Sequence, residues 1–95
     1  MESIGAYLKR QRQMRHVPLE ELAQKTKINI KTLKALEADD FSELPGFVFA
    51  KGYVRTYART IGINEEEAMV QCEDYLRTVL REDPEKKQRV RWLVP

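Results

Sequence analysis

The chain has 95 residues, of which 42% are hydrophobic and 34% charged, and its formal net charge at neutral pH is +2. This length allows one small domain with a single core, but not a core and a deep substrate cleft together. The composition is typical of a soluble globular protein. No apolar run approaches the roughly 20 residues that span a bilayer, and the charged N-terminus does not fit a secretory signal peptide. We therefore expect a cytoplasmic domain.

Caps, chain breakers and apolar spacing predict five helices. Ser3 is a suitable N-cap for a first helix that ends near Arg15, although Gly5 weakens this prediction. Pro18 fits the first turn of a second helix, where its missing N–H costs nothing. Asn29 can cap a short third helix. The apolar positions expected to pack inward from these helices are Ile4, Tyr7, Leu8, Met14, Leu19, Leu22, Ala23, Ile30, Leu33 and Leu36.

The second and third helices are separated by a tight connection at Lys27 and Ile28, which is typical of a helix-turn-helix unit. The segment ADDFSELPG follows, and its Pro-Gly pair predicts a loop. Phe41 and Leu44 are expected to fill the core from this loop.

A fourth helix is predicted from near Phe47 to Ile61, and Gly62 suits the left-handed position after its end. A fifth helix is predicted to begin after Asn64, which can act as its N-cap, to have an acidic first turn and to extend to about Glu82. Its expected inner face consists of Met69, Cys72, Leu76, Val79 and Leu80.

These elements indicate an all-α fold, a five-helix bundle that contains a repressor-like helix-turn-helix unit. We expect residues 1–83 to form the helix-turn-helix domain and residues 84–95 to form a basic tail.

Catalytic or metal chemistry is not indicated. His16 and Cys72 are the only residues of their types, and the sequence has no glycine-rich phosphate loop and no HExxH arrangement. A nucleophilic cysteine needs a base and an orienting group beside it, whereas Cys72 is expected in the core. We therefore expect a binding module without enzyme activity and without a cofactor.

The outward face of the third helix offers an interpretation as a DNA-binding surface. Lys31 and Lys34 can neutralise phosphates, and Thr32 lies beside them. Base recognition, however, favours Arg, Asn or Gln, and this surface lacks them apart from the capping residue Asn29. Acidic residues at the end of the helix would repel the phosphate backbone of DNA. A DNA-binding regulator that uses Lys31, Thr32 and Lys34 is therefore the alternative function.

The fourth helix contains four of the chain's seven Phe and Tyr residues. At 100° per residue, its core stripe consists of Phe47, Ala50, Val54, Ala58 and Ile61. One flank of the stripe carries Lys51, Arg55 and Arg59. The other flank carries Phe49, Tyr53 and Tyr57. Tyr57 borders the core, whereas Phe49 and Tyr53 point well away from it.

Two explanations fit this second apolar flank. Aromatic residues beside cations are common where proteins bind one another. Alternatively, the loop or the fifth helix covers these rings within the domain. Gly52 in the middle of the helix costs roughly 1 kcal/mol relative to alanine. It indicates that a neighbouring helix or a partner approaches closely.

The segments SIGAYLKRQRQ, PLEELAQKTKINIKTLKALEADDFSELP and FAKGYVRTYARTIGI resemble the N-terminal cytoplasmic domain of the bacterial cell-shape family RodZ, over about residues 3–64. The resemblance implies an adaptor that binds the actin-like protein MreB through aromatic residues of the fourth helix and links the filament to the membrane. The matching aromatic residues are Tyr53 and Tyr57, and Phe49 lies on the same flank. Lys51, Arg55 and Arg59 are the candidate ion-pair donors at the rim.

In that family, a single transmembrane helix and an extracytoplasmic region follow the domain. The resemblance therefore implies a location at the inner face of the bacterial inner membrane, within a longer protein. It also implies that the tail lies next to the membrane, where cations attract anionic lipid and an indole ring suits the interface. The residues concerned are Lys86, Lys87, Arg89, Arg91 and Trp92. Simple disorder of the tail is the other interpretation.

Overall fold

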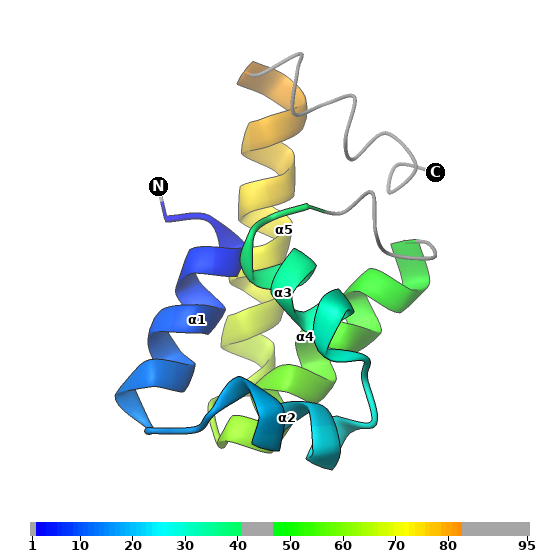
Figure 1. The fold of residues 1–95 in the computed structure, drawn as a ribbon. Coiled ribbons are helices and arrows are strands. Elements are labelled where there is room, and N and C mark those ends of the chain that lie inside the picture. The colour runs from blue at the N-terminus through cyan, green and yellow to red at the C-terminus, as the bar shows by residue number, and fades with distance from the viewer. Residues whose placement is uncertain (1, 41–46, 83–95) are drawn as a thin grey trace.

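The computed structural model describes residues 2–40 and 47–82, apart from the side chains of residues 47–50 and 79–82. The described residues form five α-helices and no strand (Figure 1): α1 (Ile4–Met14), α2 (Leu19–Thr26), α3 (Ile30–Glu37), α4 (Phe47–Ile61) and α5 (Glu65–Glu82). The predicted all-α fold with a helix-turn-helix unit is confirmed. The core positions predicted for Phe41 and Leu44, and the predicted tail, lie outside the described residues.

Local hydrogen bonds explain where the helices begin. The side chains of Ser3, Asn29 and Asn64 accept hydrogen bonds from the backbone N–H groups of Ala6, Lys31 and Glu67, at 3.1, 2.8 and 2.9 Å. Each bond satisfies a donor that has no partner within its own helix. Pro18 lies one position before α2, as its N-cap, rather than inside the first turn.

Helices α1 to α4 are each followed by a left-handed residue, and two of these residues, Gly62 and Lys27, bear on the predicted fold. Gly62 after α4 has φ 87°, as predicted for a residue without a side chain. Lys27 after α2 has φ 61° and produces the turn of the helix-turn-helix. The hydroxyl of Thr26 donates to the carbonyl of Leu22 at 2.8 Å and accepts from the N–H of Ile28 at 3.1 Å. These bonds hold the turn although a lysine occupies the left-handed position.

The helices enclose one core. In Figure 1, α1 and α4 lie on either side of the long helix α5, and both pack against it. Helix α2 packs on α4, and α3 packs on α1 and α2. The fully buried side chains include Ile4, Leu8, Leu22, Leu33, Leu36, Val54, Tyr57 and Ala58.

The predicted core was wrong at Met14 and incomplete on α5. Met14 is 62% exposed, because it lies at the end of α1, where residues 13–16 all face solvent. On α5, Ala68 and Tyr75 are buried together with the predicted Met69, Cys72 and Leu76. The predicted core positions Val79 and Leu80 belong to the part of α5 whose side chains are not described.

Gly5 has a packing role that the sequence did not indicate. A Cβ atom at this position would lie 2.5 Å from the backbone oxygen of Glu37, which is closer than real contacts allow. The N–H of Gly5 also donates to Oδ1 of Asp39 at 2.8 Å. Glycine therefore lets α1 approach the end of α3 closely, and this contact offsets its low helix propensity.

Candidate partner-binding surface on helix α4

Tyr57 does not belong to an exposed surface. Its side chain is fully buried, and its hydroxyl donates to the carboxylate of Glu37 and to the carbonyl of Leu8, the latter at 3.2 Å. The prediction that Tyr57 faces a partner is therefore corrected. Its position beside the core stripe placed it within reach of α1 and α3, and these helices supply acceptors for its hydroxyl.

The same carboxylate binds Arg12. Nε and Nη2 of Arg12 lie 2.7 and 3.1 Å from the two oxygens of Glu37, and Nη1 donates to the carbonyl of Val17 at 2.9 Å. The hydrogen bond to Glu37 raises the pKa of Arg12. Burial, followed by the hydrogen bond to Glu37, raises the pKa of Tyr57 well above its usual value. This buried polar cluster joins α1, α3 and α4.

Tyr53 lies one turn before Tyr57 and differs from it in exposure. Its side chain is half-buried and packs against the edge of the core, so part of its surface reaches solvent. The backbone of Phe49 lies in α4, but its side chain is outside the described residues. Of the three predicted aromatic residues, Tyr53 is thus the one that is described as partly exposed.

The three cations of α4 face α5 and form ion pairs with it. Lys51 lies 3.2 Å from Glu73. Arg59 makes two hydrogen bonds to Glu65, at 3.1 and 3.2 Å, and Arg55 lies 3.9 Å from the same residue. The hydrogen bond from Arg59 lowers the pKa of Glu65. The cations predicted to be rim donors are therefore already paired within the domain.

Gly52 lies between Lys51 and Tyr53 and is exposed. Within the described residues, a Cβ atom built at Gly52 would find no other atom within 4 Å. The expectation that a neighbouring helix comes close to this glycine is therefore wrong for the part of the chain that the structure describes. Among the described residues, no internal contact at this position requires glycine, although glycine makes the helix less stable than alanine would.

The helix-turn-helix presents a second charged surface. Lys27, Lys31 and Lys34 are exposed, and Thr32 is half-buried beside them. None of these lysines forms an ion pair with a described residue. The surface can thus attract phosphates, although its lysines supply charge rather than base recognition.

The described residues contain no group of three or more side chains that could hold a metal ion. Cys72 is buried in the core, and burial raises the pKa of its thiol to about 11. His16 is exposed, with φ 55°. Across the described ranges, no helix combines the length and the apolar character that crossing a membrane requires.

The bundle, its left-handed turn after α2 and the packing of α2 and α3 define a helix-turn-helix protein. The chain belongs to the family described as "Helix-turn-helix domain", which it matches over residues 7–68. It is also similar to the "Cytoskeleton protein RodZ" of Streptococcus pneumoniae (strain ATCC BAA-255 / R6), with 32% identity over 65 residues. This match covers 68% of the chain and 24% of the relative, so the chain spans about a quarter of that relative's length. The domain is thus a helix-turn-helix domain of the RodZ type. No solved structure matches the chain.

Proposed function

We propose that this domain is a non-enzymatic adaptor that binds an actin-like filament protein of the MreB type through α4. Its relationship to a cytoskeleton protein supports a role in cell shape. In a longer protein, the domain would lie at the inner face of the bacterial inner membrane and connect the filament to it.

Gly52 is the observation that carries the proposal. A central glycine weakens a helix by roughly 1 kcal/mol relative to alanine, and the described residues give it no internal purpose. Its neighbour Tyr53 is half-buried, so part of this residue reaches solvent. Because Gly52 has no side chain, a partner can approach the backbone of α4 closely at this position. The neighbouring tyrosine ring can then anchor the contact.

The ion pairs of α4 define the rim of this surface. Arg55 and Arg59 share Glu65, and Glu66 is the second partner of Arg55 at 3.6 Å. A partner would therefore meet paired charges of both signs. Such charges determine the orientation in which the partner binds more than they increase its affinity. We assign the contact to Tyr53, Lys51, Arg55 and Arg59, and Phe49 remains a predicted member. Tyr57 is left out because it is buried.

Co-sedimentation of the whole chain with polymerised MreB-type protein tests this proposal. Tyr53→Ala should reduce the bound fraction strongly, with roughly a tenfold loss of affinity if the ring is an anchor worth about 1.4 kcal/mol. Gln13→Ala, at an exposed position on α1, is the control and should bind as the wild type does. Unchanged binding of Tyr53→Ala, with an intact circular dichroism spectrum, would exclude this surface.

The connection to the membrane rests on the composition of the tail, which lies outside the described residues. Lys86, Lys87, Arg89 and Arg91 can bind anionic lipid, and Trp92 can enter the interface. Flotation of the chain with vesicles that contain phosphatidylserine should be strong at low salt and weak at high salt. Equal flotation with neutral vesicles would contradict this assignment.

DNA binding is the second candidate, because Lys27, Lys31 and Lys34 of the helix-turn-helix form no ion pair with a described residue. Lys31→Ala combined with Lys34→Ala should then abolish binding to a duplex and reduce its salt dependence. Lys25→Ala is a matched control, since Lys25 lies on α2 and pairs with Glu21 at 3.6 Å. If wild type and double variant bind random duplex equally weakly at physiological salt, the DNA-binding interpretation fails.

A further inference from the structure

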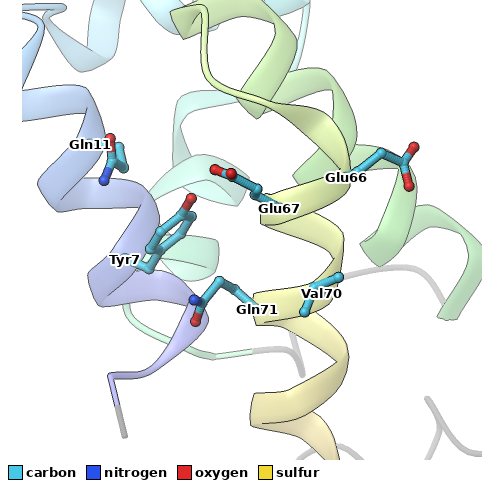
Figure 2. Close-up of a pocket in the computed structure, with 6 residues that line it drawn as sticks. All are labelled: Tyr7, Gln11, Glu66, Glu67, Val70 and Gln71. Carbon is cyan, nitrogen blue, oxygen red and sulfur yellow. The ribbon is translucent and has the colours of Figure 1, made fainter.

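A hollow between α1 and α5 is not used by the proposed function. It is lined by Tyr7, Gln11, Glu66, Glu67, Val70 and Gln71. Figure 2 shows Tyr7 and Gln11 on α1 opposite Glu67 and Gln71 on α5, with the tyrosine ring between the two helices. The hollow thus combines the edge of a mostly buried aromatic ring, two amides and two carboxylates.

One of the exposed apolar side chains borders the hollow. Among the described residues, the exposed large hydrophobic side chains are Met14 (62%) and Val70 (55%). Val70 borders the hollow, and Met14 follows Tyr7 and Gln11 on one face of α1, at the i, i+4, i+7 spacing. Val70 therefore gives the hollow an exposed apolar edge, and among the described residues it stays uncovered.

The charges around the hollow favour a basic occupant. Glu67 is exposed and forms no ion pair with a described residue, and Glu66 is 81% exposed although it lies 3.6 Å from Arg55. Arg10, whose guanidinium lies 5.8 Å from the centre of the Tyr7 ring, is paired with Glu2 at 2.9 Å. Arg15 would repel a basic occupant. Its guanidinium donates a hydrogen bond to the side-chain oxygen of Gln11 at 2.8 Å.

The chain itself contains a segment of matching chemistry. The sequence RVRWLVP, residues 89–95, contains two cations, several apolar side chains and the only tryptophan of the chain. Val70 lies about 18 Å from Glu82 along α5, at about 1.5 Å per residue. The chain from Glu82 to Trp92 can span up to about 33 Å when extended. The segment is therefore long enough to return to the hollow.

We propose that the hollow between α1 and α5 is an intramolecular docking site for this tail, with Trp92 against Tyr7 and Val70 and with Arg89 or Arg91 at Glu67. The proposal does not depend on the filament partner. A tail held there in the absence of lipid would be released when an anionic surface competes for its cations. The site would then make the exposure of the tail dependent on the membrane.

Trp92 is the probe, because it is the only tryptophan and its emission reports the environment of the tail in the complete chain. Without lipid, we expect emission at a shorter wavelength than that of a peptide of residues 84–95, together with reduced quenching by acrylamide. Both effects should be independent of protein concentration and should weaken in high salt. Identical emission and quenching in the chain and the peptide would overturn the proposal. A shift that disappears on dilution would also overturn it, because it would indicate the tail of a second copy.

Glu67→Lys and Val70→Lys should each shift the emission of Trp92 toward that of the free peptide. Glu20→Lys is the matched control for Glu67→Lys, since both are exposed glutamates in the first turn of a helix and neither is ion-paired with a described residue. Thermal unfolding monitored by circular dichroism establishes that the variants are folded. If Glu67→Lys and Glu20→Lys leave Trp92 equally unaffected, the site is wrong.

Discussion

The hydroxyl of Tyr57 on α4 donates a hydrogen bond to the carboxylate of Glu37 on α3. That carboxylate also accepts two hydrogen bonds from Arg12 on α1, and the side chains of Arg12 and Glu37 are only 11% and 8% exposed. The arrangement holds three helices at one point. It is stable because each buried polar group has a partner, whereas an isolated charge there would be costly.

Tyr57→Phe should lower the free energy of unfolding by roughly 1–3 kcal/mol, because the carboxylate of Glu37 loses a buried donor. Urea denaturation followed by circular dichroism measures this change. Tyr7→Phe is the control, since the described structure gives its hydroxyl no hydrogen bond, and it should change stability by less than about 0.5 kcal/mol. Equal stability of Tyr57→Phe and wild type would mean that the hydroxyl contributes nothing to folding.

Gly5→Ala should destabilise the domain by about 1–3 kcal/mol, although alanine is the better helix former. The added methyl group would press against the backbone of Glu37, which cannot move aside as a flexible side chain can. Thermal unfolding measures the effect. A stability equal to or above that of the wild type would show that α1 and α3 are further apart than described.

Gly52→Ala should act in opposite directions on folding and binding. The free energy of unfolding should rise by about 0.5–1 kcal/mol, because alanine costs less than glycine inside a helix and meets no described atom. Binding to the filament protein should weaken, because the methyl group enters the proposed contact. Denaturation and co-sedimentation of the same preparation measure the two effects. Binding that equals wild type in a stabilised variant would remove Gly52 from the contact.

Measurements at alkaline pH should reveal how much Tyr57 contributes to the free energy of unfolding. Burial raises its pKa, so the folded state holds the proton of the phenol more firmly than the unfolded chain does. The protonated hydroxyl contributes fully to the free energy of unfolding at pH values below about 10, which is the pKa of a tyrosine in the unfolded chain. This contribution is lost as the pH rises above that value. The free energy of unfolding should therefore fall more steeply with pH in the wild type than in Tyr57→Phe. Denaturation between about pH 9 and 11 measures the two slopes.

The sequence predicted the features that depend on neighbouring residues. Ser3, Asn29 and Asn64 cap their helices as expected, and Gly62 ends α4, because each of these roles is fixed by residues a few positions away. The spacing of apolar residues likewise placed Val54, and other positions of α4, in the core.

Features that depend on distant residues were not predictable in the same way. Gly5 appeared to be only a weakness of α1, since the carbonyl of Glu37 that comes close to it is remote in sequence. Tyr57 lies between core and surface by its angle on α4, and its burial depends on acceptors from two other helices. The paired state of Arg55 and Arg59 also depends on how α5 lies against α4. A helical projection contains none of these relationships.

Because the carboxylates of Glu65 and Glu66 together balance the charges of Arg55 and Arg59, their side of the domain has little long-range electrostatic field. A distant macromolecule would not be drawn to it by charge, and added salt would slow its approach only slightly. Shape fit at short range would then govern recognition by this surface, so the association rate constant should be nearly independent of ionic strength.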